Sequence, residues 1–273
     1  MRKKIIGLPR AYLYYKNNKL WRNFFKYLGC SVCVSPSTND EIRENATIFN
    51  INTCYNNKIY MSHIFYLFNK CDYVLVENNC FYQDIMRILP NISMILYKDY
   101  DNLLLEFYSF FCMGFRVSKN VFRIVYAFIK AKNKEVKVKR IVLNNQNNML
   151  YNENKKILIV SMYDSIYDRY VDDLSYNYII NNDIGLIYAN VLNKKLGASY
   201  AKHVKNDIYN KKLCGAIFYY QEAVDGIIFL DNKGVCDKID SFMKEYQIKK
   251  KYLVVNGDKM GEKIIDFIKE DIL

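Results

Sequence analysis

The first strand–helix–strand unit of the chain is formed by residues 4–34, with the sequence KIIGLPRAYLYYKNNKLWRNFFKYLGCSVCV. Its opening run, Lys4–Gly7, is mostly apolar and is broken at Pro9, which is typical of a short buried strand. Hydrophobic residues then recur at helical spacing as far as Leu28, where a glycine follows, and Ser31–Val34 is a second strand-like run. Strands that alternate with helices predict a parallel, doubly wound sheet.

The same alternation continues to the end of the chain, and it sets the expected domains. Further strand-like runs occupy residues 72–76, 92–96, 156–160, 185–188, 225–230 and 252–255. We therefore predict an α/β protein of two Rossmann-like (flavodoxin-like) three-layer domains with parallel sheets, residues 1–100 and 155–273. Residues 101–154 are predicted to be a helical connection, in which the Asn-rich stretch 144–154 is the best linker.

Length and composition restrict the class of protein. The chain has 273 residues, of which 51% are hydrophobic, and its mean hydropathy is −0.17. No apolar run reaches the ~18 residues that span a bilayer. The basic start Met1–Lys4 is followed almost at once by Gly7 and Pro9, so no signal peptide is expected. We predict a cytoplasmic protein without a membrane partner.

The net charge of +12 has two interpretations. One is an anionic partner, such as a CoA ester or an acidic protein. The other is a general bias of the chain toward Lys, Asn, Ile and Tyr. Nucleic-acid binding is the least favoured reading, because no recognition motif accompanies the charge.

Three of the eight cysteines are candidate metal ligands. Cys54 lies in the first turn of a predicted helix, where the helix dipole favours the thiolate that binds metal. Cys80 and Cys236 each come just after an apolar strand, where ligands of α/β sheets bind. If the two domains face each other, these thiolates could hold an iron–sulfur cluster with one iron open to another ligand. The alternative is that each cysteine is a small core residue.

The remaining cysteines are more easily explained as structural. Cys30 and Cys33 form a C-x-x-C motif, but residues i and i+3 of a strand point to opposite faces, which argues against a redox pair. Cys71 precedes a strand, and Cys112 and Cys214 lie in apolar helical runs, so all three are expected in the core.

Other chemical signals in the sequence are weak. His63 lies on the helix after Cys54, and it is either a helix-face histidine with satisfied hydrogen bonds or a polar group lining a cleft. An acidic helix start contains Asp164, Asp168, Asp172 and Asp173, which the helix dipole alone could explain. The sequence contains no glycine motif for phosphates and no nucleophile elbow.

Taken together, these residues resemble the acyl-CoA dehydratase activase-related proteins, relatives of the 2-hydroxyacyl-CoA dehydratase subunits. The resemblance is strongest over the opening motif Ile6–Ala11 and covers nearly the whole chain. The other matching segments are Tyr14-Tyr15, Leu20-Trp21, Phe24-Phe25, Leu28-Gly29, Ser35–Asn39, Cys54-Tyr55 with Lys58 and His63, Ile166–Asp168, Leu213–Ala216, Val224–Ile227, Cys236 and Asp240-Ser241.

The resemblance implies a function. Two Rossmann-like domains would hold a [4Fe–4S] cluster between them, with Cys54, Cys80 and Cys236 as its ligands. The cleft would be lined by Pro9, Arg10, His63 and Asp168. Relatives work with a separate ATP-hydrolysing activator that delivers one electron at low potential, and they remove water from a 2-hydroxyacyl-CoA through a ketyl radical.

Departures from the family pattern leave two hypotheses. Prolines that follow the ligand cysteines in the family are missing here, where Asn56 stands two residues after Cys54 and Phe81 stands directly after Cys80. Loss of proline loosens the turns that would aim the ligands. The first hypothesis is an iron–sulfur protein with an electron-transfer or accessory role, for which dehydratase (lyase) activity of its own is less favoured. The alternative is a non-catalytic binding or scaffold protein of the same fold without a cluster.

Overall fold

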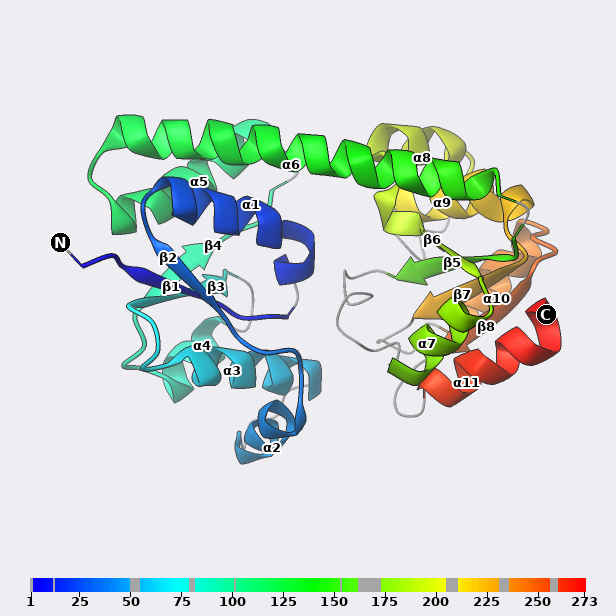
Figure 1. Ribbon diagram of the computed structural model, residues 1–273, viewed down its shortest axis with the longest axis horizontal. Helices are drawn as coiled ribbons and strands as arrows, with labels where there is room; N and C mark the ends of the chain where they lie inside the picture. The colour runs from blue at the N-terminus through cyan, green and yellow to red at the C-terminus, as the bar shows by residue number, and fades with distance from the viewer. Residues whose placement is uncertain are drawn as a thin grey trace. The chain divides into compact units, whose positions relative to one another are not determined.

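The computed structural model describes residues 2–11, 13–49, 55–78, 82–100, 102–152, 154–161, 173–204, 211–230, 236–255 and 260–273 (Figure 1). Its contacts divide the chain into two units, Met1–Lys137 and Val138–Leu273. The first unit contains β1 (Ile5–Leu8), α1 (Leu13–Tyr27), β2 (Ser31–Val34), α2 (Asp40–Ile48), α3 (Tyr55–Leu67), β3 (Tyr73–Glu77), α4 (Tyr82–Ile88), β4 (Met94–Tyr97), α5 (Leu103–Val117) and the start of α6 (Val121–Leu150). The second contains β5 (Lys156–Ser161), α7 (Asp173–Asn181), β6 (Gly185–Tyr188), α8 (Lys194–Tyr200), α9 (Lys211–Tyr220), β7 (Gly226–Leu230), α10 (Cys236–Glu245), β8 (Lys251–Val255) and α11 (Met260–Phe267).

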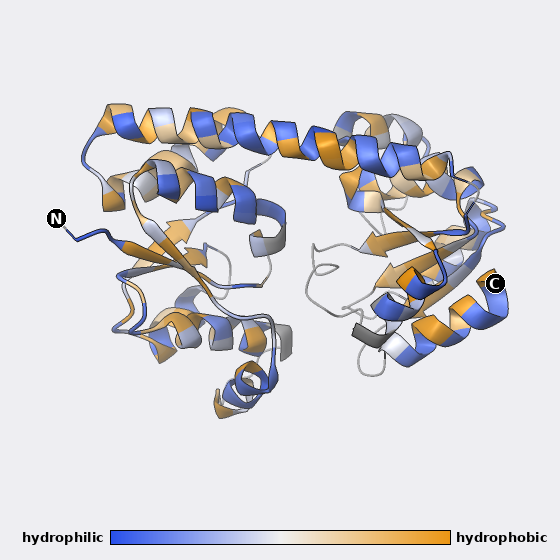
Figure 2. Ribbon diagram, viewed as in Figure 1, coloured by the Kyte–Doolittle hydropathy of each residue, from blue (hydrophilic) through white to orange (hydrophobic). Residues whose placement is uncertain are grey.

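Each unit is a three-layer α/β structure, as the alternation of strands and helices predicts. The first sheet has the strand order β2-β1-β3-β4 and the second has β6-β5-β7-β8, and every pair of neighbouring strands is parallel. The predicted fold class is confirmed. In Figure 2 the strands of both sheets are the most continuously hydrophobic elements, which is typical of strands covered on both faces.

In the first unit, successive strand residues face different helices. Ile6 and Leu8 pack with α1, α5 and α6, whereas Val74 and Val76 pack with α3 and α4 on the other face. Rings dominate the first face: Phe24 and Phe110 meet edge to face at 4.9 Å. Such contacts add to the free energy gained by burying the rings.

The second unit follows the same rule. Leu158 and Phe229 face α9 and α10, and Ile159 and Ile228 face α7 and α11. The helices α8 and α9 approach so closely that a Cβ atom on Gly215 would overlap the backbone carbonyl of Gly197.

Residues 144–150 of the predicted linker at 144–154 form the end of α6, which continues without a break to Leu150. In this part of α6, the side-chain amide of Gln146 donates to the carbonyl oxygen of Tyr188 at 3.1 Å and accepts from the N–H of Tyr188 at 3.1 Å. The same amide nitrogen donates to the hydroxyl of Tyr220 at 2.9 Å. These bonds tie the asparagine-rich end of α6 to the second unit.

An aspartate closes the amino edge of each sheet in the same way. The N–H of Ile5 donates to Asp72 Oδ2 at 2.7 Å, and the N–H of Asp72 donates back to the carbonyl of Ile5 at 2.9 Å. In the second unit the N–H of Lys156 donates to Asp225 Oδ2 at 2.8 Å, and the N–H of Asp225 returns a bond to Lys156 at 2.8 Å. Both aspartates directly precede the third strand of their unit. Each pair of hydrogen bonds, which we call a latch, therefore fixes the first strand against the third.

Candidate functional site

The carboxyl edge of the first sheet gathers the polar side chains of the first unit. The connections from β1 and β3 leave this edge in opposite directions, since β2 lies on one side of β1 and β4 lies beyond β3. Ligands of open α/β sheets bind at such a switch point, outside the carboxyl ends of the strands. The residues that follow β1, β2, β3 and β4 therefore form the candidate site.

Glu77, the last residue of β3, occupies the N-terminus of α1. Its Oε1 accepts a hydrogen bond from the N–H of Leu13, the first residue of α1, at 2.8 Å. Its own N–H donates to the hydroxyl of Tyr60 on α3 at 2.9 Å. An acidic group at this end of a helix is stabilised by the unpaired N–H groups and by the helix dipole. Glu77 thus joins three elements around the switch point.

The pKa of the Glu77 carboxyl group is raised to about 7. Burial is the main cause, because it disfavours the charged form, and the negative charge of Asp99 adds to it. The hydrogen bond from Leu13 and the charge of Lys16 act in the opposite direction. A carboxyl group with this pKa can hold or release a proton at neutral pH, which is the property of a general acid or base.

His63 on α3 is fully buried and hydrogen-bonded at both ring nitrogens. Ser35 Oγ, just after β2, lies 2.9 Å from Nδ1, and Thr38 Oγ1 lies 3.2 Å from Nε2. The serine oxygen also accepts a bond from the N–H of Arg10 at 2.7 Å. His63 therefore joins the loops after β1 and β2.

The pKa of His63 is lowered to about 4, first because burial disfavours the imidazolium and second because Arg10 is positively charged. His63 is therefore uncharged at neutral pH. This environment suits a fixed hydrogen-bonding group rather than a residue that gains and loses protons near pH 7.

A second carboxylate lies beyond the end of β4. Asp99 forms an ion pair with Lys16 of α1 and accepts a hydrogen bond from the hydroxyl of Tyr97 at 3.0 Å. Asn17 on α1 donates to the same hydroxyl at 3.5 Å. Glu77 and Asp99 thus approach α1 from two strands.

The structure describes the side chains of three of the seven residues predicted for the site. Pro9, Arg10 and His63 all belong to the carboxyl edge of the first sheet, and Arg10 and His63 are joined through Ser35. That they line a ligand cleft stays a prediction. Cys54, Cys80 and Asp168 lie outside the described residues. Cys236 is the first residue of α10, and its side chain is outside the described set as well.

The described cysteines are dispersed. Cys30 packs with the cluster of α1 and α6, and Cys33 packs with the cluster of α3 and α4, so the two thiols of the C-x-x-C motif lie on opposite faces as predicted. Cys71 contacts Cys33, and burial raises the pKa of its thiol to about 12. Cys214 is buried as expected, but Cys112 is exposed, because it lies on the side of α5 opposite the buried Phe110 and Met113. Within the described residues no three His, Cys, Asp or Glu side chains form a group that could hold a metal ion.

Sequence reasoning missed Glu77 and the partners of His63. Glu77 was visible as the acidic residue that ends the run Tyr73–Val76, in the position where parallel strands present ligands. Its bond to Leu13 depends on a distant segment of the chain, so spacing alone gave no signal. Ser35 and Thr38 belong to the matching segment Ser35–Asn39, but nothing in that segment showed that they contact a histidine.

Comparison with known proteins identifies the first part of the chain. Residues 5–80 match a protein-family model described as "CoA enzyme activase uncharacterised domain", which confirms the CoA activase-related assignment for this region. No curated protein matches the chain. A solved structure, the C-terminal domain of glucosamine-fructose-6-phosphate aminotransferase from Francisella tularensis, aligns with 97% of this chain and 81% of its own, at 10% identity and a TM-score of 0.27. A likeness at this level supports no functional conclusion. No helix among the described residues is both long and apolar enough to cross a membrane.

Proposed function

We propose that the protein is an accessory component of acyl-CoA dehydratase systems that carries an iron–sulfur cluster and passes electrons. The match of residues 5–80 to the CoA activase-related family supports the accessory role. The ligands of the cluster would be the thiolates of Cys54, Cys80 and Cys236, and the cluster would be of the [4Fe–4S] type.

The observation that carries the proposal is the position of the residues that flank these cysteines. Tyr55, the next residue after Cys54, begins α3. Asn78, two residues before Cys80, donates its N–H to the carbonyl of Tyr97 at the carboxyl edge of the first sheet. Because α3 runs back to the start of β3, its N-terminus faces this same edge. The flanks of two candidate ligands therefore meet at one edge.

The second unit offers the third candidate in an equivalent position. β7 holds the same place in its sheet as β3 does in the first, and Cys236 follows β7 as Cys80 follows β3. Cys236 and Tyr55 each begin a helix, and a thiol at a helix N-terminus is shifted toward the thiolate. The donor set thus fits a metal centre by its chemistry.

When bound, such a cluster accepts and donates single electrons at low potential. The chain would supply the thiolates, and the hydrogen-bonded pair of His63 and Ser35 would hold α3 against the loop after β2. Glu77 would hold a proton near the site at neutral pH. The expected partners are an ATP-hydrolysing activator as the electron donor and an acyl-CoA system as its destination.

Iron analysis tests the proposal. We expect the chain, purified without oxygen and supplied with iron and sulfide, to bind about four irons and to absorb near the thiolate-to-iron band. Cys54→Ser, Cys80→Ser and Cys236→Ser should each lose most of that iron. Cys112→Ser, which changes an exposed thiol on α5, is the matched control and should keep it.

A colourless chain that takes up no iron would refute the cluster. The chain would then be a binding or scaffold protein of the same fold, and the raised pKa of the Glu77 carboxyl group would be unrelated to electron transfer. Equal iron in all four variants would show that the metal is bound by other residues, and it would refute the proposed ligands.

A further inference from the structure

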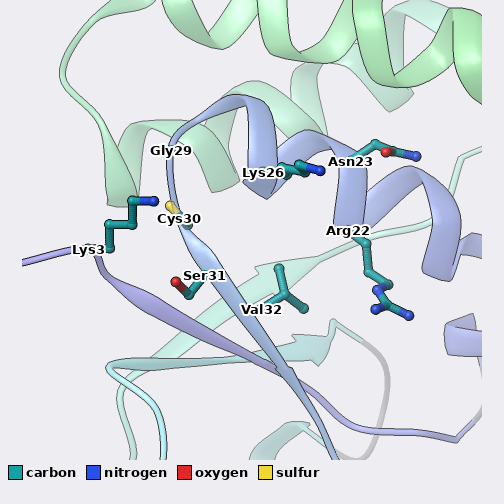
Figure 3. A pocket seen from close by; sticks show the side chains of 8 residues that line it. All are labelled: Lys3, Arg22, Asn23, Lys26, Gly29, Cys30, Ser31 and Val32. Atoms are coloured by element: carbon teal, nitrogen blue, oxygen red, sulfur yellow. The ribbon is translucent and has the colours of Figure 1, made fainter.

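A basic hollow of about 680 Å³ lies near the amino end of the first sheet, on the side opposite the candidate site. Figure 3 shows its lining from three segments: the start of the chain before β1, the last turns of α1, and the turn into β2. The lining residues are Lys3, Arg22, Asn23, Lys26, Gly29, Cys30, Ser31 and Val32. The volume is in the range of small-ligand sites, which is about 300–1,000 Å³.

The lining has one sign of charge. Lys3, Arg22 and Lys26 are cations, and the eight lining residues include no carboxylate. Among the residues that the structure describes, none of these three cations forms an ion pair. Asn23 and Ser31 add neutral hydrogen-bonding groups. A concave surface with unneutralised cations raises the local concentration of anions.

Two further cations are held beside the hollow by neutral groups. Lys4 donates to the carbonyl of Val117 at 3.2 Å, and Arg123 donates from Nε to the carbonyl of Tyr27 at 3.5 Å. Both are close enough to Cys30 to lower the pKa of its thiol, although burial raises that pKa more strongly. Their charges add to the potential of the hollow.

Gly29 makes this arrangement possible. Its φ is +81°, a conformation that residues with side chains rarely adopt, and a Cβ atom here would overlap the guanidinium of Arg123. The missing side chain lets Arg123 of α6 lie over the turn between α1 and β2.

The dipole of α1 explains only part of the charge. A cation in the last turn of a helix is favourable, and Lys26 is such a residue. Lys3 and Lys4 precede β1, however, and Arg123 belongs to α6, so three of the five cations come from outside α1. The dipole of α1 therefore accounts for Lys26 but not for the cations that come from outside α1.

The backbone of β2 adds a polar edge to the hollow. β2 is an edge strand, and Ser31 and Ser35 donate their N–H groups to the carbonyl oxygens of Lys4, just before β1, and of Leu8, the last residue of β1. The alternate residue Val32 therefore turns its N–H and C=O away from β1, on the side of the hollow. An anion there could receive both ionic contacts and a backbone hydrogen bond.

We propose that this hollow binds a ligand of nucleotide size that carries two or more phosphate groups. Arg22 would pair with one phosphate through its planar fork of donors, and Lys3 and Lys26 would act as point charges on another. The site is separate from the proposed cluster ligands and does not depend on them.

Calorimetric titration at physiological ionic strength, with inorganic pyrophosphate, ATP and coenzyme A as probes, tests the site. We expect at least one probe to bind at one site per chain, with an affinity that falls as salt is raised. In the double variant Arg22→Glu/Lys26→Glu, that affinity should fall at least ~100-fold, because each reversed charge turns an attraction into a repulsion. Binding of ATP and coenzyme A without pyrophosphate would show that the nucleoside part is also recognised.

The matched control is Lys244→Glu/Lys263→Glu, which changes the net charge equally on exposed positions of α10 and α11 and should leave the affinity within about twofold. A second readout is alkylation of Cys30, mapped by mass spectrometry, which a bound probe should slow at least ~5-fold in the wild-type chain and not in the double variant. Circular dichroism would confirm that both variants fold. The proposal is overturned if none of the three probes binds, or if the control weakens binding as much as the double variant does.

Discussion

The two units of the chain have the same scaffold at one edge of the sheet and different chemistry elsewhere. Both sheets have the same strand order, and in both an aspartate before the third strand, Asp72 or Asp225, holds the first strand by paired hydrogen bonds. No sequence repeat between the halves reveals this equivalence. The paired hydrogen bonds of this aspartate are therefore a structural feature that both sheets share at their amino edge.

The two units differ in how closely their helices pack around glycine. In the first unit Gly114 of α5 lies against the side chain of Ile124 on α6, and in the second Gly215 of α9 lies against the backbone of Gly197 on α8. A side chain can move aside and a backbone cannot. The same layered fold should therefore tolerate substitution to different degrees in its two halves.

Substitution of these glycines should give the largest effect. Gly215→Ala places a methyl group into the Gly197 carbonyl and should lower the free energy of unfolding by at least about 3 kcal/mol. Gly114→Ala would meet Ile124 Cγ2 at 2.7 Å, where the isoleucine can shift, and should cost about 1–2 kcal/mol. Urea unfolding measures both. Equal losses would contradict the contrast between side-chain and backbone contacts.

Glu77 gives the first unit a distinctive pH dependence. Its pKa of about 7 in the folded chain is above the ordinary 4.5, so the folded state binds more protons between these values and stability falls as the pH rises through them. Between pH 5 and pH 8 the wild type should lose about 2.5 kcal/mol relative to Glu77→Gln. If the stability of the wild type and of Glu77→Gln changed equally between pH 5 and pH 8, Glu77 would not be a buried carboxyl group that is protonated in the folded chain.

His63 should act in the opposite direction. Its pKa of about 4 is below the ordinary 6.5, so the folded state binds fewer protons in this window and stability is lost as the pH falls from about 6.5 toward 4. Relative to His63→Gln, which does not titrate, the wild type should lose about 2 kcal/mol between pH 7.5 and pH 5. Thermal unfolding across this range is the measurement, and a wild type that gains stability on acidification would show that the ring is charged in the folded chain.

Loss of either aspartate latch should have an effect no larger than those of Glu77 and His63. Asp225→Ala leaves the half-buried N–H of Lys156 without its acceptor and should cost about 2 kcal/mol. Asp72→Ala exposes the equivalent N–H of Ile5 to water and should cost about 1 kcal/mol. Asn at either position keeps an acceptor oxygen and should restore part of the loss. A larger loss of unfolding free energy in Asp72→Ala than in Asp225→Ala would contradict the prediction that the bond to the more buried N–H contributes more.

Most of the fold was predictable because it depends on local patterns. The run Ser31–Val34 and the helix after Cys54 were both expected, since apolar periodicity and turn residues mark such elements. The helical structure of residues 144–150 was not expected, because polar composition there is typical of a linker and the bonds of Gln146 go to distant residues. The helix α8 was not expected, because its seven residues carry too short a pattern.

The candidate site was predictable only in part. Arg10 and His63 were chosen from the sequence, and the structure joins them through Ser35. Glu77 was not chosen, because its significance arises from burial and from contact with α1, which no local pattern reports. The five cations of the basic hollow could not be grouped from the sequence for the same reason, because they come from three separate segments of the chain.

Mössbauer spectroscopy of the chain reconstituted with ⁵⁷Fe and sulfide is the most direct test of the proposed cluster. Three thiolate ligands should give a spectrum of tetrahedral iron–sulfur sites in which about a quarter of the iron differs from the rest, since one iron lacks a cysteine. Cys54→Ser should abolish that spectrum. A spectrum of unspecifically bound iron alone, unchanged in Cys54→Ser, would contradict the account.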